Sequence, residues 1–365
     1  MATVGLINLG CPRNLVDSEV MLGLLKKSGF TITEDFNNCD AVVVNTCSFI
    51  KDAKRESIDL ILQLIELKKE KKIKSIIVTG CLPQRYPAEL KKDLKEVDSF
   101  LGTNDFIKIP EVVKKTLSGK GVSIISKKHD FLYDHTLPRD MITPGHFVYV
   151  KLSEGCNNSC SYCVIPKIRG RLRSRTAESI LEEVKILSRN SRISEINLIG
   201  QDITLYGTDL YGKPKLAAIL RQVAALKAAK WMRLLYTHPE HYSDELIDVV
   251  RDEPSICKYL DLPLQHVNDR ILKLMNRAIT KEKILNLINR LRKEVPDLAI
   301  RTTFIVGFPS ESDKEFKEMF DFIREVKFER LGIFEYSHEE GTSAYRFSGQ
   351  ISDKIKKERF DAIME

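Results

Sequence analysis

The sequence predicts an α/β protein with an N-terminal open parallel sheet over residues 1–120, a linker over 121–145 and a partial barrel of six β/α units over 146–365. Short apolar runs alternate with amphipathic helical segments in both halves, which is the pattern of parallel strands joined by crossover helices. A series of six such units favours a partial barrel, whose ligand-binding residues lie at the C-terminal ends of the strands.

Three apolar runs define the expected strands of the first domain: Val4–Leu9, Ala41–Val44 and Ser75–Val78. Between the second and third runs, apolar residues recur at i, i+3, i+4 and i+7, which predicts a helix with one buried stripe. The stripe consists of Ile58, Ile61, Leu62 and Ile65. Because helices separate the strands, we expect parallel pairing with right-handed crossovers.

The residues between 103 and 145 are less regular than the segments on either side. A short helix is expected at Glu111–Leu117 and a strand at Val122–Ser126, followed by a polar stretch with Pro138 and Pro144. Proline and polar residues are typical of connecting segments. We therefore interpret residues 121–145 as a linker.

The second domain shows the same alternation from Phe147 onward. Its expected strands are Phe147–Leu152, Glu195–Ile199, Met232–Tyr236, Tyr259–Leu262, Ala299–Val306 and Leu331–Tyr336. Its expected helices are Thr176–Leu187, Leu216–Leu226, Ser243–Val250, Asp269–Met275, Lys281–Arg292, Asp313–Val326 and a last one at Ser352–Glu365. Strands and helices thus alternate throughout this domain, as a β/α barrel requires.

The composition excludes several classes of protein. Of the 365 residues, 43% are hydrophobic and 30% are charged, so the chain is neither disordered nor fibrous. No run reaches the ~18 apolar residues of a membrane span, and the N-terminus lacks the features of a secretory signal. We therefore expect a cytoplasmic protein whose eight cysteines stay reduced, which favours metal or redox chemistry over disulfides. The net charge of +7 is compatible with a partner such as RNA but too small to identify one.

Three cysteines follow the first strand of the second domain. Cys156, Cys160 and Cys163 have the spacing C-x3-C-x2-C, which allows three thiolates to surround one corner of an iron–sulfur cube. A closed cluster takes four cysteines, so three leave one iron open to another ligand. Tyr162 places an aromatic ring beside that open position. The alternative is a structural zinc site built on the CxxC pair, but of the cysteines only Cys257 follows that pair in the chain.

Three further cysteines each follow a predicted strand of the first domain. Cys11 follows INLG, Cys47 follows VVVNT and Cys81 follows IIVTG. The C-terminal ends of parallel strands share one edge of a sheet, so we expect these thiols to converge there and again leave one position open. The alternative is that they are packing residues of the core, which is how we interpret Cys39 and Cys257.

These residues carry a resemblance to a known enzyme family. The C-x3-C-x2-C motif with an aromatic residue before its last cysteine, at the start of a β/α barrel, resembles the radical S-adenosylmethionine (SAM) superfamily. The three upstream cysteines resemble its methylthiotransferase branch. The matching stretches, which extend over essentially the whole chain, are LGCPRNLVDSE (Leu9–Glu19), EGCNNSCSYCVIPKIRGRLRSR (Glu154–Arg175), GQDITLYGTDLYG (Gly200–Gly212), YTHPEH (Tyr236–His241), YLDLPLQHVNDRILKLMNR (Tyr259–Arg277) and EYSHEEGTSAY (Glu335–Tyr345).

Within that branch, three differences favour the enzymes that modify a ribosomal protein over those that modify tRNA. Residues 10–14 are GCPRN, where the tRNA enzymes usually have GCQMN. Residues 201–203 are QDI in place of QNV, and residues 265–267 are QHV in place of QSG.

The resemblance implies methylthiolation of the β-carbon of an aspartate in ribosomal protein uS12, with methylthiolation of a tRNA adenosine as the alternative. It implies SAM and two 4Fe–4S clusters, one on Cys156, Cys160 and Cys163 and an auxiliary one on Cys11, Cys47 and Cys81. A 5′-deoxyadenosyl radical from SAM would remove hydrogen from the target carbon, which is too unreactive for acid–base or nucleophilic catalysis. Sulfur would come from the auxiliary cluster, and the methyl group from a second SAM.

The resemblance also implies partners. The substrate would be uS12 or the small ribosomal subunit, and electrons would come from a donor such as flavodoxin or ferredoxin. We expect a monomer that binds no membrane. The family ends with a β-rich TRAM domain, and this chain stops at Glu365, where that domain would begin, so we expect either that the sequence is a fragment or that the protein lacks this domain. A protein of a different class, a non-enzymatic metal-binding module that binds RNA, would hold zinc and would not cleave SAM.

Positions on the barrel rim indicate candidate SAM contacts. Besides Tyr162, these are Gly200, Gln201 and Asp202 after the second strand, Thr237 and His238 after the third, and Gly307 after the fifth. Glycine allows the backbone to approach a ligand closely. The alternatives for His238 are a hydrogen-bonded loop histidine or, with His241, a weakly supported zinc site.

Five cations alternate with other residues just after the C-x3-C-x2-C motif: Lys167, Arg169, Arg171, Arg173 and Arg175. In an extended chain all five would point to one side and form a row that receives an acidic side chain or an RNA phosphate. The alternative is a solvated loop. Trp231 opens a strand and is expected in the core.

Overall fold

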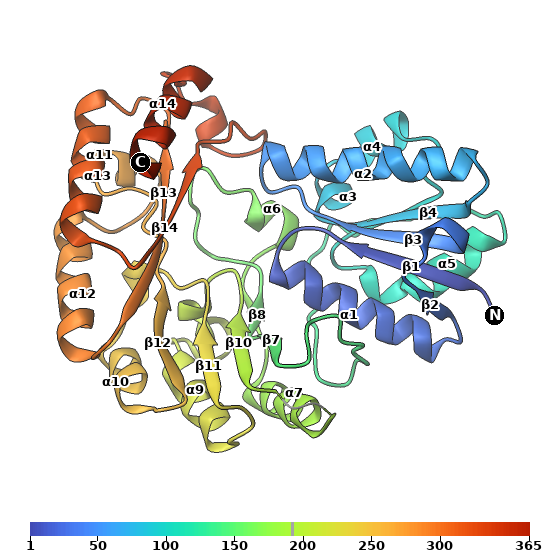
Figure 1. Cartoon of the computed structure of the whole chain (residues 1–365), viewed down its shortest axis with the longest axis horizontal. Helices are drawn as coiled ribbons and strands as arrows, with labels where there is room; N and C mark the ends of the chain where they lie inside the picture. The colour runs from blue at the N-terminus through green and yellow to red at the C-terminus, as the bar shows by residue number, and fades with distance from the viewer. Residues whose placement is uncertain (191–192) are drawn as a thin grey trace. The chain divides into compact units, whose positions relative to one another are not determined.

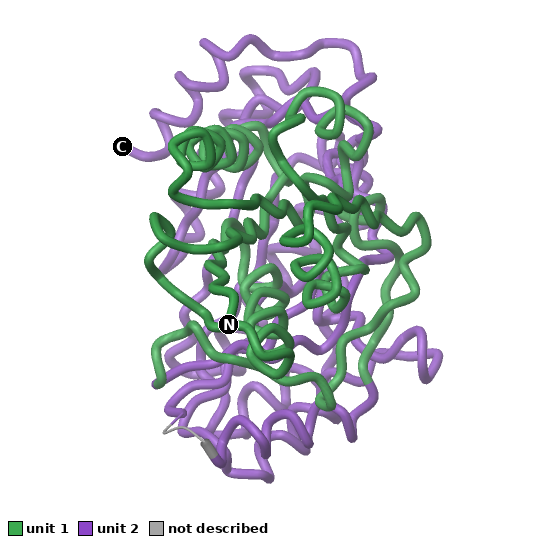
Figure 2. Tube along the Cα trace, turned by 90° about the vertical axis from the view of Figure 1, so that its right-hand side faces the viewer, with its two compact units in different colours: residues 1–145, 165–175 green, residues 146–164, 176–365 purple. Residues whose placement is uncertain are grey.

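The structure, a computed structural model, describes residues 1–190 and 193–365 and consists of two compact units (Figure 2). Unit 1 comprises residues 1–145 and 165–175, and unit 2 comprises residues 146–164 and 176–365. The residues of the predicted linker, 121–145, are grouped with unit 1, and so is a segment that begins two residues after Cys163.

Unit 1 is built on a six-stranded parallel sheet with the strand order β2-β1-β3-β4-β5-β6 (Figure 1). The strands are β1 (Thr3–Asn8), β2 (Thr31–Thr33), β3 (Cys39–Thr46), β4 (Ile73–Gly80), β5 (Ser99–Leu101) and β6 (Ser123–Ile124). The three strands expected before residue 80 are confirmed and are neighbours in the sheet, with β3 between β1 and β4. The sequence did not predict the short strands β2 and β5.

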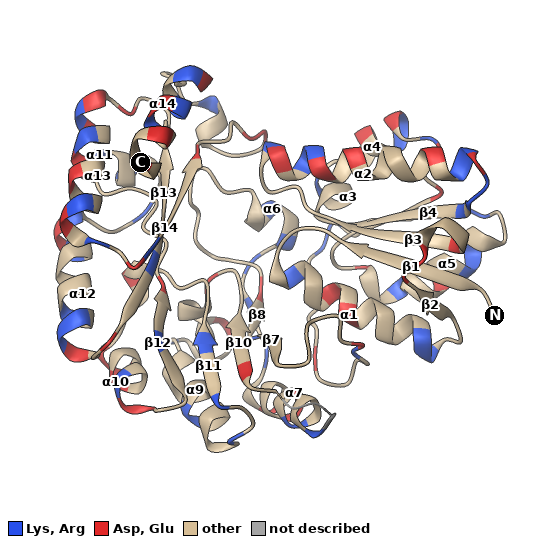
Figure 3. Cartoon of the chain, viewed as in Figure 1, with Lys and Arg blue, Asp and Glu red and all other residues tan. Residues whose placement is uncertain are grey.

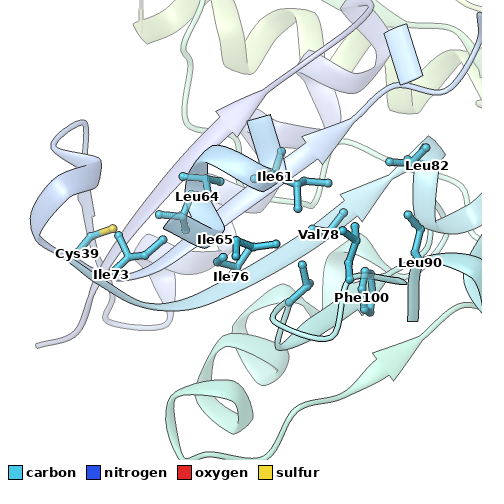
Figure 4. Close-up of a cluster of buried hydrophobic side chains, with 14 residues drawn as sticks. Cys39, Ile61, Leu64, Ile65, Ile73, Ile76, Val78, Leu82, Leu90 and Phe100 are labelled. Carbon is cyan, nitrogen blue, oxygen red and sulfur yellow. The ribbon is translucent and has the colours of Figure 1, made fainter. Parts of the chain in front are cut away.

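The helices of unit 1 cover its sheet. They are α1 (Pro12–Lys27), α2 (Lys51–Lys69), α3 (Cys81–Arg85), α4 (Pro87–Asp93), α5 (Ile109–Leu117) and α6 (Ile165–Arg169). The core in Figure 4 joins α2 to β3 and β4 through Ile61, Ile65 and their neighbours. Leu62, expected in the buried stripe, is exposed instead and Leu64 is buried, because Leu62 lies about 100° around the helix from Ile61. Acidic and basic residues are interspersed along α2 (Figure 3), so this helix presents no surface of a single charge.

A buried carboxylate anchors the end of unit 1's first segment. Glu19 on α1 is fully buried and accepts hydrogen bonds from Nε and Nη2 of Arg139 at 2.9 and 2.6 Å. It also accepts from the backbone N–H groups of Ile142 and Thr143 at 3.1 and 3.3 Å. These residues, expected to be linker, therefore have a specific structure.

Unit 2 is built on a second six-stranded parallel sheet, with the strands in chain order β7-β10-β11-β12-β13-β14 (Figure 1). They are β7 (Phe147–Lys151), β10 (Glu195–Ile199), β11 (Trp231–Leu234), β12 (Ile256–Asp261), β13 (Ala299–Val306) and β14 (Arg330–Glu335). The two-residue strands β8 (Ser153–Glu154), of unit 2, and β9 (Arg173–Ser174), of unit 1, lie outside both large sheets. Because β7 and β14 are edge strands, the sheet stays open. The six expected strands and the partial barrel are confirmed.

The helices of unit 2 follow its strands in the expected order, with the short α8 as an addition that the sequence did not predict. They are α7 (Ala177–Asn190), α8 (Thr208–Tyr211), α9 (Leu216–Ala225), α10 (Asp244–Asp252), α11 (Asp269–Leu274), α12 (Lys281–Glu294), α13 (Asp313–Val326) and α14 (Asp353–Met364). Short 3₁₀ turns occur in both units, at Phe36–Asn38, Phe106–Lys108, Ile203–Leu205, Pro239–His241 and Ala344–Arg346. Trp231, expected in the core, is 45% exposed at the start of β11 with Lys230 over its ring.

The start of α13 shows how sequence determines a helix boundary in unit 2. Ser312 is the N-cap, and its side chain and that of Glu315 complete a capping box, which satisfies two otherwise unpaired backbone donors. Arg270 adds two charged hydrogen bonds to the same carboxylate at 2.6 and 2.7 Å. Together these lower the pKa of Glu315 to about 2, with the Arg270 hydrogen bonds as the largest cause.

Candidate functional site

The three cysteines of unit 1 lie at the C-terminal ends of three adjacent strands. Cys11 follows β1 and is the N-cap of α1, Cys47 follows β3, and Cys81 follows β4 as the first residue of α3. Cys11 and Cys47 both act electrostatically on the Cys81 thiol, and Cys11 acts on that of Cys47. The structure therefore brings the three sulfur atoms together at one edge of the sheet.

Close backbone contacts produce this convergence. Gly10 has φ +92°, and a Cβ built on it would lie 2.7 Å from Cβ and 3.2 Å from Sγ of Cys47. Gly80 has φ +95°, and a Cβ there would lie 2.4 Å from Oδ1 of Asn45. Both turns thus require glycine in order to place the cysteines that follow them.

Asn14, in the first turn of α1, joins the three cysteine-bearing loops. Its Nδ2 donates to the carbonyl oxygens of Leu9 and Thr46 at 3.2 and 2.9 Å. Its Oδ1 accepts from Sγ of Cys81 at 3.7 Å. Sequence reasoning missed this residue, although its position three residues after Cys11 places it on the same helix end.

The three thiols have different electrostatic surroundings. Burial raises the pKa of Cys81 to about 12 and also raises that of Cys47. Burial also opposes ionisation of Cys11, but the guanidinium groups of Arg13 and Arg169 and nearby backbone N–H groups outweigh it, so the net pKa of Cys11 is lowered. Metal binding at such a site displaces protons, because the thiolate is the ligand.

The loop with the other three cysteines, in unit 2, is tied to the end of α11. Ser161 donates from its N–H to the carbonyl of Met275 at 3.0 Å and from its hydroxyl to that of Leu274 at 2.7 Å. The N–H of Cys163 bonds to the carbonyl of Cys160 at 3.1 Å, and the N–H of Asn158 donates to Sγ of Cys156 at 3.4 Å. The loop has no regular secondary structure, and these contacts determine its form.

Tyr162 and Arg277 form one wall beside this loop. Nη1 of Arg277 donates to the Tyr162 hydroxyl at 3.3 Å, and Nη2 donates to the carbonyl of Pro263 at 2.8 Å. Burial, and then the neighbouring Cys160, raise the pKa of the Tyr162 hydroxyl. Arg277 is buried, and sequence reasoning did not single it out as a candidate contact, although it ends one of the stretches that carry the family resemblance.

The residues after β10 and β11 form a hydrogen-bonded rim. Gln201 donates to Glu154 at 2.5 Å, and Glu154 also accepts from Lys151 at 2.9 Å. Asp202 accepts from the side chains of Thr204 and Asn158, the latter at 2.7 Å. The Asp202 contact connects the rim to the cysteine loop.

The two histidines of this rim, His238 and His241, contact neighbouring residues of the same segment. Nδ1 of His238 accepts from the N–H of Glu240 at 3.3 Å, and its ring stacks on that of His241 with centroids 4.8 Å apart. Burial, Arg277 and His241 lower the pKa of His238 to about 2, so the ring is neutral at physiological pH. Ligand atoms of Asp202, His238 and His241 lie within 4.8 Å of one another, but both carboxylate oxygens already accept hydrogen bonds from protein groups.

Thr237 and Gly307 have contacts of their own. The Thr237 hydroxyl donates to the carbonyl of Asp261 at 2.5 Å and accepts from Tyr242 at 2.9 Å. A Cβ on Gly307 would lie 2.4 Å from Cγ of Lys356 on α14, so a side chain of this fold already fills the space that the glycine leaves.

Three buried polar atoms near the loop have no hydrogen-bond partner within the described parts of the chain. They are Oε1 of Gln201, Oγ of Ser153 and Nε of Arg277. Buried polar atoms are normally hydrogen-bonded, and an exception indicates a ligand or water. A small polar molecule such as SAM, with amino, carboxylate and ribose groups, fits this donor and acceptor set.

The predicted row of five cations is wrong. Residues 165–169 form the helix α6, so the alternation does not describe an extended chain. Arg169 and Arg175 are buried, the latter over the ring of Tyr133. Arg173 donates to the carbonyls of Arg169 and Arg171. Only Lys167 and Arg171 of the five are exposed.

Comparisons with known proteins identify the family. The profile of the Radical SAM superfamily matches residues 150–323, and that of the uncharacterized protein family UPF0004 matches residues 3–102. The ribosomal protein uS12 methylthiotransferase RimO of Geobacter sulfurreducens is 48% identical over 362 residues, which are 99% of this chain and 81% of that protein. The chain belongs to the RimO family of radical SAM methylthiotransferases. The RimO protein of Desulforamulus reducens is likewise 48% identical over 365 residues, 100% of this chain and 82% of that protein.

Solved structures support the fold. The radical SAM methyltransferase TsrM of Kitasatospora setae has a TM-score of 0.64 with 14% identity, covering 92% of this chain and 73% of that one. At that identity the likeness shows a shared fold. Membership in the superfamily implies SAM and a 4Fe–4S cluster, and the three loop cysteines and the unpartnered polar atoms beside them fit these groups. Across residues 1–190 and 193–365, no helix is both long and apolar enough to cross a membrane.

Proposed function

We propose that the chain methylthiolates the β-carbon of an aspartate in ribosomal protein uS12, the substrate named for its RimO relatives. The observation that carries the proposal is the convergence of three thiols at the sheet edge of unit 1, in a chain that has three more in the C-x3-C-x2-C loop of unit 2. Each set offers three sulfur ligands, and a 4Fe–4S cluster so held keeps one iron open. Two such sites match a reaction that needs both radical formation and a source of sulfur.

Two sets of ligands follow from this proposal. The first cluster is held by Cys156, Cys160 and Cys163, and the auxiliary cluster by Cys11, Cys47 and Cys81. When bound, the clusters and SAM supply a hydrogen-abstracting radical, a sulfur atom and a methyl group.

The chain's own residues bind and orient the cofactor. Gln201 and Ser153 offer buried oxygen atoms and Arg277 a buried N–H group to SAM. Asp202 holds Asn158, which lies between Cys156 and Cys160 in the loop, and so restricts the loop's position. The neutral ring of His238 shapes the rim without adding charge. We further propose contacts to SAM from Tyr162, Gly200 and Thr237, but not from Gly307, whose open space is filled by Lys356.

Iron and sulfide content after anaerobic reconstitution tests the cofactors. We expect about eight irons in the wild type, because each cluster contains four. In the loop-cysteine variant (Cys156→Ala, Cys160→Ala, Cys163→Ala) and in the edge-cysteine variant (Cys11→Ala, Cys47→Ala, Cys81→Ala), we expect about four each. Cys257→Ala is the matched control and should retain the wild-type content. Zinc without sulfide, or about eight irons in the edge-cysteine variant, would contradict the proposal.

A substrate assay distinguishes the two acceptors. The reconstituted enzyme is incubated with SAM, dithionite and either uS12 or a tRNA, and each product is analysed by mass spectrometry. We expect a methylthio group on one aspartate of uS12. The alternative, modification of a tRNA adenosine, is favoured by a product on tRNA and none on uS12. The edge-cysteine variant should cleave SAM and leave both acceptors without the methylthio group.

Three further proposals concern the setting of the reaction. A ribosomal protein substrate places the enzyme in the cytoplasm, with the small ribosomal subunit as a partner. Flavodoxin or ferredoxin would donate electrons, which replacement of dithionite by each protein tests. Sedimentation of the reconstituted chain tests the expected monomer.

A further inference from the structure

Arg169 is a buried cation at the edge of unit 1 where the three cysteines meet. It ends α6, and its side chain is 4% exposed. Nη1 donates to Oδ2 of Asp17 at 2.8 Å, and Nη2 donates to Oδ1 of Asn14 at 2.5 Å. Nη2 also lies 3.7 Å from Sγ of Cys81, within hydrogen-bond distance of sulfur.

The orientation of this guanidinium is determined by its neighbours. Asn14 must direct its oxygen toward Arg169, because its Nδ2 is committed to the carbonyls of Leu9 and Thr46. Asp17 lies one turn further along α1, and its side chain is 5% exposed. Two acceptors on one helix thus hold the planar guanidinium with an N–H group directed at sulfur, a geometry that a flexible ammonium would not maintain.

The Arg169 guanidinium reaches the sulfur of Cys81, the buried thiol of the three. Its charge also acts electrostatically on the Cys11 and Cys47 thiols. A buried thiolate would be costly without a compensating cation.

We infer that Arg169 is a positioning residue of the auxiliary site, whose guanidinium donates to the sulfur of Cys81 and, with Asp17 behind it, sets the reduction potential of the cluster that the three cysteines hold. This inference rests on the proposed auxiliary cluster. A donor to a ligand sulfur and a nearby positive charge both stabilise the more negative, reduced cluster, which raises its potential.

Because Arg169 is paired with Asp17, the inference predicts opposite shifts of the reduction potential when each of the two is replaced. A purely structural role of Arg169 would not predict this. Loss of Arg169 removes the cation that donates to Sγ of Cys81, which disfavours the reduced cluster. Loss of the Asp17 charge removes an anion paired with that cation, which favours the reduced cluster. Both changes break the same buried ion pair, so both destabilise the fold, yet they move the potential in opposite directions.

The test is a redox titration followed by electron paramagnetic resonance, in the full chain with the loop-cysteine substitutions, so that only the auxiliary cluster contributes. We expect the midpoint of Arg169→Gln to be more negative than that of the parent and the midpoint of Asp17→Asn to be more positive. The expected size is a roughly tenfold change in the ratio of reduced to oxidised cluster at the parent midpoint, typical of a hydrogen bond to a charged group. Arg139→Gln is the matched control, because it breaks another buried ion pair on α1.

Each result has one meaning. Midpoints that stay unchanged, or that move in the same direction in both variants, overturn the inference while leaving the cluster itself in place. Loss of all iron from the parent with loop-cysteine substitutions refutes the auxiliary cluster instead. If Arg169→Gln assembles no cluster, the direction in Asp17→Asn decides: a positive shift supports the inference, and any other result overturns it.

Discussion

Gly10 offers a direct test of how the sheet edge of unit 1 is built. Its φ of +92° already disfavours any side chain, and a Cβ would lie 2.7 Å from Cβ of Cys47, an atom that cannot move without the backbone. Gly29, at the other end of α1, provides a matched control. It has φ +85°, and a Cβ there would meet no atom within 4 Å.

The two substitutions share one cost and differ in another. Gly29→Ala should lower the free energy of unfolding by about 1–2 kcal/mol, the cost of a positive φ for a residue with a side chain. Gly10→Ala should lower it by the same amount plus about 1–3 kcal/mol for overpacking against Cys47. Because Cys47 must move, Gly10→Ala should also lose iron from the auxiliary site.

Iron content in the loop-cysteine variant and thermal unfolding of the apo chain measure these effects. We expect Gly29→Ala to retain about four irons and Gly10→Ala to retain far fewer. We also expect Gly10→Ala to unfold at the lower temperature, by roughly 2–4 °C for each kcal/mol of difference. Equal iron content and equal stability of the two variants would refute the reasoning, because the contact with Cys47 would then have no consequence.

Three further outcomes follow from buried, titrating and exposed groups. Glu19→Gln should cost about 3–5 kcal/mol in urea unfolding, because it breaks the buried ion pair with Arg139, whereas Glu66→Gln, in an exposed pair with Lys69, should change nothing measurable. The pKa of Glu315 is depressed to about 2, so its contribution is present above the unfolded value of about 4.5 and is lost as pH falls through 2; Glu315→Gln should therefore flatten the loss of stability between pH 5 and pH 2, and an unchanged slope would argue against the Arg270 contact. Trp231, the single tryptophan, is 45% exposed, so its fluorescence should be quenched by iodide in the folded chain, and protection from iodide would contradict the exposed position.

The sheet edges were predictable because parallel strands impose a simple rule. Cys11, Cys47 and Cys81 each follow a β-branched apolar run, and the C-terminal ends of adjacent parallel strands meet whatever the loops do. The strand order β1-β3-β4 then brings the three thiols together. This part of the site depends on the parallel topology of the sheet, which the alternation of strands and helices in the sequence predicts.

The rest of the site depends on contacts that periodicity does not describe. The sequence did not predict α1, because the face that it buries includes Asn14, Asp17, Ser18 and Glu19, so the usual apolar stripe is interrupted. Arg169 was expected either in a row of cations that receives an acidic group or in a solvated loop, since alternation in the sequence resembles an extended chain. Both the helix α1 and the burial of Arg169 depend on polar contacts between residues far apart in the sequence. Sequence periodicity does not reveal such contacts.

The segment that carries Arg169 also constrains the order in which the protein can mature. Unit 1 contains residues 1–145 and then 165–175, so a chain growing from its N-terminus has all three edge cysteines before it has the cation that faces them. At about 5–20 residues per second, synthesis of the 24 residues from His146 to Arg169 takes roughly 1–5 s. During that interval Asp17 has no counterion from α6. Unit 1 therefore cannot reach its final electrostatic state until the ribosome has also made the cysteine loop of unit 2, which precedes Arg169 in the chain.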